Sequence, residues 1–394
     1  MKREFLDLGR QPIANNFVKE WSEDEFFYDL KVVFDDETNL VSLKDFVKPE
    51  MMFNDSYVYN TSKSTPMITH FKTTAEKLKE RFNPKTVLEI GSNDGTFISN
   101  FDKETSYCVE PCDNFAKITG DKGYNTRTEF WSEELSNELK SRNGSIDLIY
   151  AANCICHIQD LDDCFRGVHN LLSDTGVFVF EDPSLLMMLE RCSYDQIYDE
   201  HAHIFSVIAL DNILRKNGLM IFDVENLSVH GGSNRIYVKK PNIPSDNTIT
   251  QNYYRNIKEE MEFGVDDFGT YKNFASRVEQ SRIDLLNLLF DIREGGGRVI
   301  SIGATSKSTT IFNYCGINEA NIECITDTTP EKQNTIAPGS HIPVVDRKDI
   351  NLSDYTHAFL GAWNFKSVIA NAEREFVENG GKFITHVPKV MEFS

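Results

Sequence analysis

The segment Ile197–His203 gathers side chains suited to proton transfer. His201 is the candidate general base, because an imidazole has an unperturbed pKa near neutrality. Glu200 or Asp199 is expected to orient its ring, and Tyr198 to donate a hydrogen bond to a developing oxyanion. The alternative is a solvated acidic loop with a structural histidine. The position of the segment after an expected strand of a parallel sheet favours catalysis.

A second histidine, His157, follows another expected strand, in the segment Ala152–Ile158. Asn153 is expected to contact a bound cofactor there, and His157 to polarise a substrate. The alternative, with equal support, is a histidine at a helix start that backbone groups satisfy.

A glycine turn lies in residues 87–97, which read VLEIGSNDGTF and predict a buried strand, a tight turn and a helix start. Gly91 and Gly95 can adopt backbone angles closed to other residues and let a ligand lie against the main chain. Asn93 and Asp94 are expected to cap the next helix. The spacing differs from the dinucleotide fingerprint, and the turn has no P-loop lysine.

Two acids accompany this turn. Glu89 precedes the first glycine and suits a cationic ligand. Glu110, followed by Pro111, ends the next expected strand, where an acid can accept both hydroxyls of a ribose. Together they predict a site for S-adenosylmethionine (SAM), a nucleoside with a sulfonium, an ammonium and no phosphate. For the turn alone, an ordinary strand–helix connection is the alternative.

Two further glycine-containing turns are candidate substrate sites. In the first turn, residues 229–235, paired glycines bring the backbone close to a ligand. The guanidinium of its arginine can donate two hydrogen bonds to an oxygen anion. The alternative is a bulged hairpin. The second turn, Gly303–Lys307, can present helix-start N–H groups to a phosphate, with Lys307 adding charge, although a plain helix cap is as well supported. The candidates in the first turn are His230, Gly231, Gly232, Ser233 and Arg235.

The bulk composition excludes several classes of function. The chain has 394 residues, with 41 basic and 61 acidic side chains and a net charge of −20. Such acidity argues against a nucleic-acid partner, although a local cluster of bases can hold a small anion. No apolar run reaches the length of a membrane span, and the first residues lack a signal peptide's apolar core. The eight scattered cysteines form no Cys-x-x-Cys pair, so we expect reduced thiols in the cytoplasm and no zinc.

Strand and helix patterns alternate from about residue 72 and predict an α/β fold. We expect a doubly wound, Rossmann-like SAM-binding domain at 71–240, a small N-terminal lobe at 1–70 and a second α/β domain at 241–394. A polar, proline-containing linker is expected at 241–247. The predicted strands of the first sheet are Val87–Ile90, Tyr107–Val109, Ile146–Tyr150, Gly176–Glu181, Leu219–Val224 and Asn234–Val238.

Motifs along nearly the whole chain match, in order, those of one enzyme family. The chain resembles the SAM-dependent C-methyltransferases that act on nucleotide-linked deoxysugars in making branched sugars. The matching segments are Asp7–Asn16 (Leu-Gly-x-x-Pro-x-x-Asn), Tyr57–Ser64, Gly91–Thr96, Glu110–Pro111, Asn153–Ile158, Ile197–His201, His230–Arg235, Gly303–Lys307 and Pro338–Pro343.

The resemblance implies roles for the candidate residues. His201 would be the base, assisted by Glu200, and the C-terminal domain would help hold the nucleotide diphosphate. Three ring side chains would line the reacting centre: Tyr198, His157 and one tyrosine of the pair Tyr57 and Tyr59. We expect Tyr59 at the reacting centre and Tyr57 against the substrate.

The expected substrate is a keto-deoxysugar linked to a nucleoside diphosphate. Loss of a proton next to the ketone gives an enolate, which takes the methyl group and leaves S-adenosylhomocysteine. The family suggests the third carbon of a 4-keto-6-deoxyhexose. Two alternatives stay open: methylation of a sugar oxygen or nitrogen, and a non-catalytic relative that only binds SAM or a nucleotide sugar. A monomer or weak dimer is expected.

One departure concerns metal binding. Members of the family usually hold a zinc ion in the N-terminal domain with two Cys-x-x-Cys pairs. Residues 33–39, where the second pair is expected, contain no cysteine. We therefore expect no metal, and an N-terminal lobe held by packing and hydrogen bonds without loss of activity.

Overall fold

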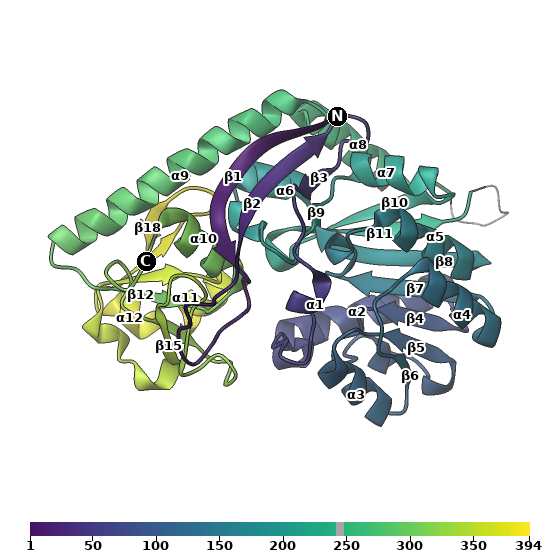
Figure 1. Ribbon diagram of the computed structural model, residues 1–394, viewed down its shortest axis with the longest axis horizontal. Helices are drawn as coiled ribbons and strands as arrows, with labels where there is room; N and C mark the ends of the chain where they lie inside the picture. The colour runs from purple at the N-terminus through teal and green to yellow at the C-terminus, as the bar shows by residue number, and fades with distance from the viewer. Residues whose placement is uncertain (242–247) are drawn as a thin grey trace.

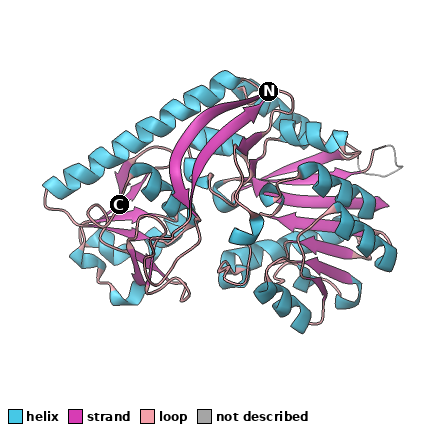
Figure 2. Cartoon of the chain, in the orientation of Figure 1, coloured by secondary structure: helices cyan, strands magenta, loops and turns pink. Residues whose placement is uncertain are grey.

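The computed structural model describes residues 1–241 and 248–394, which form three β-sheets surrounded by helices (Figure 2). Of the predicted linker at 241–247, residues 242–247 lie outside the described residues. Within the described part of the chain, no helix is long and apolar enough to cross a bilayer.

The middle sheet has seven strands and forms the Rossmann-like core. The strands from β8 to β6 are parallel, whereas β10 and β11 extend one edge in antiparallel fashion. The predicted fold class is therefore confirmed, and β6 is a strand that the sequence pattern did not indicate. In spatial order the strands are β10 (Met220–Leu227), β11 (Ser233–Lys239), β8 (Leu172–Pro183), β7 (Ile146–Ala152), β4 (Val87–Ile90), β5 (Ser106–Val109) and β6 (Asn125–Arg127).

Both faces of this sheet are apolar, which is why helices cover each of them. On β4, Leu88 and Ile90 belong to one core and Val87 to the core on the opposite face. Helix α2 (Thr65–Phe82) covers the Val87 face. The helices that contribute to the other core are α4 (Glu133–Asn143), α5 (Leu161–Leu171), α7 (Val207–Lys216) and α8 (Gln251–Phe263).

The N-terminal lobe is a four-stranded antiparallel sheet, although its sequence shows little regular periodicity. Its first strand escaped prediction because register shifts after Glu4 and after Asp7 break the alternation of apolar and polar residues. The last strand comes from the middle of the chain just after His201, so the candidate base lies where the lobe meets the middle sheet. In order the strands are β1 (Lys2–Pro12), β2 (Phe27–Asp35), β3 (Val41–Leu43) and β9 (His203–Ile204), and α1 (Pro49–Met52) follows β3 along the chain.

The C-terminal domain holds the third sheet. Its five central strands are parallel, and the strand at each edge is antiparallel to its neighbour. The long helix α9 (Phe268–Glu294) runs along the outside of β1 toward this domain (Figure 1). One apolar core includes residues of β1, β2, α6 (Leu185–Arg191), α9 and the third sheet, so packing holds the lobe to the C-terminal domain.

The third sheet and its helices have the following bounds. The strands are, in spatial order, β14 (Thr335–Ile336), β15 (Pro343–Asp346), β13 (Ile325–Asp327), β12 (Val299–Ile302), β16 (His357–Leu360), β17 (Lys382–Thr385) and β18 (Met391–Phe393). The helices are α10 (Ser306–Cys315), α11 (Lys366–Ala372) and α12 (Arg374–Glu378).

Candidate active site

The glycine turn after β4 has a left-handed backbone at Gly91 (φ 67°), Asn93 (φ 47°) and Gly95 (φ 78°). Gly91 has a packing reason for lacking a side chain, because a Cβ there would lie 2.6 Å from Sγ of Cys154. The Gly91 N–H donates to the carbonyl of Val109 at 2.8 Å. This bond keeps the turn beside the end of β5, where the ribose acid is expected.

A 3₁₀ turn, η2 (Ile98–Asn100), follows the glycine turn in place of the predicted α-helix. The carboxylate of Glu89 accepts the N–H of Ile98 at 3.0 Å. Burial raises the pKa of Glu89 well above its usual range. Glu89 therefore supports the turn from inside the protein, and its contacts lend no support to a role in binding a cationic ligand.

Asn93 and Asp94 were expected to cap an α-helix, but no α-helix directly follows them, and within the turn Asp94 accepts the backbone N–H of Thr96 at 3.2 Å. The Asn93 side chain accepts the backbone N–H of Thr61 at 3.1 Å, and Asp94 accepts that of Ser62 at 2.7 Å. Because no α-helix begins here, the two side chains fasten the segment Tyr57–Ser64 over the glycine turn instead. This fastening brings Tyr57 to the site, where its hydroxyl reaches Glu200, whereas the side chain of Tyr59 is 42% exposed.

Glu110 lies at the end of β5, and both of its carboxylate oxygens are engaged. The backbone N–H of Asn93 donates to one oxygen at 2.7 Å and that of Cys112 to the other at 2.9 Å. Each carboxylate oxygen retains a second acceptor position, so Glu110 fits the two ribose hydroxyls of SAM. Pro111 leads from this strand end into α3 (Asp113–Asp121).

His201 is held in one tautomer by two neighbours. Its Nδ1 lies 2.6 Å from the carbonyl of Gln196, which can only accept, so Nδ1 carries the hydrogen. The other nitrogen, Nε2, is then unprotonated and accepts the hydroxyl of Tyr198 at 2.9 Å. Burial lowers the pKa of His201 well below its usual value, and His157 and Lys307 lower it further. The ring is therefore neutral, and the lone pair of Nε2 accepts the Tyr198 hydroxyl.

Glu200 and Asp199 bind residues of the N-terminal lobe. The expectation that one of them orients the His201 ring is therefore wrong, because the carbonyl of Gln196 does so. Glu200 accepts hydrogen bonds from Asn15 Nδ2 at 2.6 Å and from the hydroxyl of Tyr57 at 3.1 Å. Asp199 accepts the backbone N–H of Ala14 at 2.9 Å. Burial raises the pKa of both acids. Asn15 was not singled out from the sequence, although it lies in the Asp7–Asn16 motif.

Asn153 and His157 follow β7. Asn153 has a left-handed backbone (φ 48°), and its N–H donates to the carbonyl of Glu181 at 2.7 Å. The His157 ring stacks between those of Phe53 and His201, with centroids 5.3 and 5.4 Å away. Its Nε2 is buried with no hydrogen-bond partner among the described residues, and burial lowers the pKa of His157 to about 3. The structure thus brings the ring of His157 beside that of His201.

Two lysines of the C-terminal domain lie within electrostatic range of Glu200. Lys307 is in the first turn of α10, and Lys332 donates to the carbonyl of Ala304 at 2.7 Å. Burial lowers the pKa of each lysine, while the charge of Glu200 opposes that effect. Burial and the charge of Lys307 lower the pKa of His230 to about 4. Lys332 belongs to no recognised motif, and only the fold brings it here.

The two glycines after His230 serve packing. A Cβ at Gly231 would lie 2.5 Å from the ring of Trp363, and one at Gly232 would lie 2.9 Å from Cβ of Met187. His230 itself has a left-handed backbone (φ 53°) and a buried Nε2 without a partner among the described residues. The side chain of His230 therefore remains a candidate for binding substrate, while Gly231 allows close contact with the C-terminal domain and Gly232 close contact with helix α6.

Arg235 lies in β11, which begins at Ser233, and it does not fit its predicted role in binding a ligand anion. Its guanidinium donates to Glu181 at 2.8 Å, to Glu225 at 3.0 Å and to Thr74 at 2.5 Å. Glu181 and Glu225 are its direct neighbours on the two adjacent strands, and Thr74 lies on helix α2, so all three nitrogens are engaged within the protein. Arg235 is 4% exposed.

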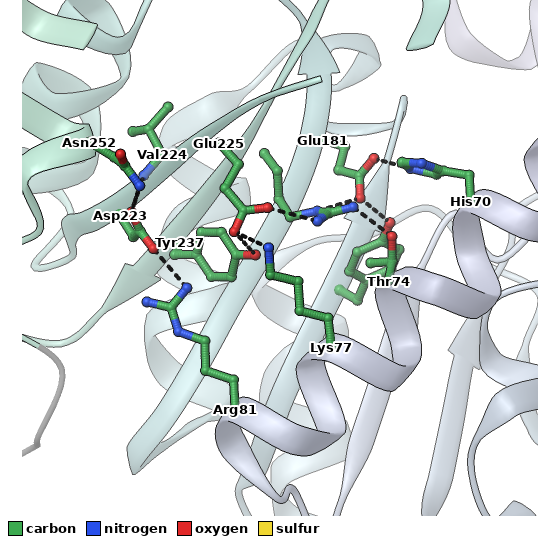
Figure 3. Close-up of polar contacts among 12 residues, drawn as sticks. His70, Thr74, Lys77, Arg81, Glu181, Asp223, Val224, Glu225, Tyr237 and Asn252 are labelled. Carbon is green, nitrogen blue, oxygen red and sulfur yellow. Dashed lines mark hydrogen bonds and ion pairs between the residues drawn. The ribbon is translucent and has the colours of Figure 1, made fainter. Parts of the chain in front are cut away.

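The carboxylates of Glu181 and Glu225 turn toward helix α2, from which His70 and Lys77 reach them (Figure 3). His70 lies 2.6 Å from Glu181. Burial alone would raise the pKa of Glu181, but the His70 hydrogen bond and the charge of Arg235 lower it to about 2. This network holds β11 in place, the strand that begins directly after the segment His230–Gly232.

Family models match three parts of the chain. Residues 68–224 match a methyltransferase domain, and residues 228–388 match a C-methyltransferase C-terminal domain. Residues 1–53 match a zinc binding domain, yet they contain no cysteine and no histidine. The thiolate and imidazole ligands that zinc prefers are thus missing from that segment, and strand pairing and packing hold the lobe.

The chain is also similar to named proteins. It is 30% identical over 395 residues to C-methyltransferase NovU of Streptomyces niveus, which covers 98% of this chain and 93% of that protein. A SAM-dependent methyltransferase from Clostridium acetobutylicum is 17% identical with a TM-score of 0.35, covering 44% of this chain and 92% of that one. The PH0226 protein of Pyrococcus horikoshii is 12% identical with a TM-score of 0.38, covering 50% of this chain and 100% of that one. By its identity to NovU over nearly its whole length, this chain belongs to the family that its motifs indicated, the SAM-dependent sugar C-methyltransferases.

Proposed function

We propose that this C-methyltransferase methylates a carbon next to the ketone of a keto-deoxysugar linked to a nucleoside diphosphate. The third carbon of a 4-keto-6-deoxyhexose is the proposed position. The observation that carries the proposal is the Tyr198–His201 pair, in which an unprotonated ring nitrogen is held in a buried site. A C–H group becomes a nucleophile only when a base removes its proton, so such a nitrogen suits carbon methylation.

Each site residue has a proposed role in the reaction. His201 takes the proton at Nε2 and becomes an imidazolium, which can no longer accept the hydroxyl of Tyr198. Tyr198 is then free to donate to the enolate oxygen, and His157 is a second candidate for that contact. Bound SAM supplies an electrophilic methyl group next to the carbon. The imidazolium then releases its proton to solvent.

The basic residues of the C-terminal domain are the proposed site for the diphosphate. Lys307, Lys332 and His230 provide positive charge or hydrogen-bond donors in a chain whose net charge is −20. Burial disfavours the charge of both lysines, so a diphosphate would restore their usual pKa by pairing with it. We propose that these two lysines pair with the diphosphate and so contribute to substrate binding.

Solvent exchange tests the proposal. In deuterium oxide, a nucleotide-linked 4-keto-6-deoxyhexose should exchange the hydrogen at its third carbon when the enzyme is present, and His201→Asn should abolish the exchange. With isotope-labelled SAM, the methyl carbon of the product should then show the chemical shift of a C–CH₃ group. No exchange with the wild type, or an unimpaired His201→Asn variant, would contradict the proposed base.

The same product spectrum separates the alternatives. A methyl shift typical of an oxygen- or nitrogen-bound carbon would favour the rival transfer. No methyl transfer to any keto-sugar nucleotide, together with measurable SAM binding, would favour a non-catalytic binding protein.

A further inference from the structure

Three side chains beside the candidate base form a set of metal ligands that the proposed function does not use as such. Cys156, His157 and His201 each offer one ligand atom, and these three atoms lie within 4.8 Å of one another. Cys156 and His157 are adjacent in η4 (Ile155–His157), and the stacked rings of His157 and His201 join the two segments.

A second observation points to a ligand at the same place. The Nε2 atom of His157 is buried and has no hydrogen-bond partner among the described residues. A buried polar atom without a partner carries a free-energy cost that a bound ligand would remove. The rings of Phe53 and His201 are neighbours of the His157 ring, with centroids 5.3 and 5.4 Å away, so packing keeps this nitrogen near the other two ligands.

The chemistry of the donors selects the kind of ligand. One thiolate and two imidazoles are the soft and borderline donors that bind Zn²⁺, and hard cations such as Mg²⁺ prefer oxygen. Tetrahedral zinc holds N and S ligands about 3.3–3.6 Å apart, so small side-chain rotations would close the observed arrangement. Three protein ligands leave a fourth position for water.

We infer that Cys156, His157 and His201 form a binding site for Zn²⁺ or a similar transition metal, distinct from the N-terminal segment that matches a zinc binding domain. The cysteine binds as a thiolate, so its proton passes to the solvent when the metal enters. The hydroxyl of Tyr198 must release the lone pair of His201 at the same time. Metal binding and proton abstraction therefore compete for one imidazole, if the proposed function holds, and the metal is an inhibitor.

Cobalt(II) provides a direct test that does not depend on activity. The metal-free wild type should bind one Co²⁺ per chain and develop a near-ultraviolet thiolate-to-metal charge-transfer band, which added Zn²⁺ removes. Cys156→Ser should lose the band and bind Zn²⁺ at least about tenfold more weakly, since a direct ligand contributes no less than an outer partner. His157→Asn should weaken Zn²⁺ binding similarly.

Cys324→Ser is the matched control, because Cys324 is another buried thiol, in the C-terminal domain. This variant should keep the charge-transfer band and the wild-type Zn²⁺ affinity. Circular dichroism of each variant establishes that it is folded. The proposal is overturned if the wild type shows no thiolate band, or if a folded Cys156→Ser or His157→Asn variant binds Zn²⁺ as tightly as the wild type. Either result would leave the proposed methyl transfer untouched, since proton exchange is measured without metal.

Discussion

The hydroxyl of Tyr198 lies 2.9 Å from Nε2 of His201, and this contact joins the two side chains into one unit. Nδ1 of the same ring lies 2.6 Å from the carbonyl of Gln196, so the hydroxyl can only act as the donor. A proton that arrives at Nε2 must displace this bond. Base and hydrogen-bond donor are thereby coupled, because protonation of one releases the other.

The coupling predicts that substitutions at the two positions do not add. His201→Asn should lower kcat by about 10²–10⁴-fold, the usual contribution of a general base. Tyr198→Phe should lower it by about 10²–10³-fold, as the loss of one oxyanion donor does. The double variant should be within about tenfold of His201→Asn alone, because residues that act as a unit are not additive. Steady-state kinetics with a keto-sugar nucleotide measures all three.

SAM affinity serves as the control for this series. All three variants should bind SAM with the wild-type Kd in calorimetry, since neither residue lies on the glycine turn. If the losses in kcat multiply in the double variant, the two residues act independently and the coupled unit is rejected.

A second prediction concerns the ribose. Glu110→Gln should raise the Kd for SAM by about 10–100-fold, because hydrogen bonds to a charged acceptor contribute about 1.5–3 kcal/mol. Isothermal titration calorimetry without the sugar substrate measures this directly. Glu104→Gln, an exposed acid before β5, is the control and should bind as the wild type does. Equal Kd values for SAM in the two variants would show that Glu110 does not bind the cofactor.

Strand positions and the glycine turn could be predicted because each rests on local patterns. The predicted strand Val87–Ile90 has the bounds of β4, and Glu110 lies one strand further on, as its spacing indicated. The local sequence alone does not show whether an α-helix or a 3₁₀ turn follows the glycine turn. A tertiary contact, Glu89 with Ile98, stabilises a 3₁₀ turn there instead.

The partners of the charged side chains could not be predicted from the sequence. Arg235 stands beside glycines that suggest a ligand, and only the strand order places it between Glu181 and Glu225. Lys332 has no short-range signal of its own, and Asn15 ends a motif that does not reveal its partner, yet the fold brings both toward Glu200. A linear motif can therefore indicate which residues matter, while the partner of each charge depends on strand order and domain packing.

The Arg235 network yields a third prediction, on stability. Arg235→Met should destabilise the fold by about 3–5 kcal/mol, because it leaves the buried carboxylate of Glu181 without its arginine. Thermal denaturation should show a lower midpoint, while the KM for the sugar nucleotide stays near the wild-type value. Arg255→Met, at an exposed position of α8, is the control and should melt as the wild type does. A raised KM with unchanged stability would restore the anion-binding role.

The final prediction is a pH dependence of stability that arises at Glu260, a buried acid of helix α8. This side chain caps α7 by accepting the N–H groups of Val207 at 2.8 Å and Ile208 at 2.9 Å. Burial raises its pKa from 4.5 to about 7. The folded state therefore keeps a proton that the unfolded chain has lost, and stability falls as the pH rises from 4.5 to 7.

Over that range the free energy of unfolding of the wild type should fall by about 3 kcal/mol more than that of Glu260→Gln, which cannot titrate. Urea denaturation at a series of pH values measures the two slopes. Glu259→Gln removes the exposed neighbouring acid and should follow the wild-type curve. Parallel curves for the wild type and Glu260→Gln would show that Glu260 is ionised throughout, because its two backbone donors would then outweigh the burial of its charge.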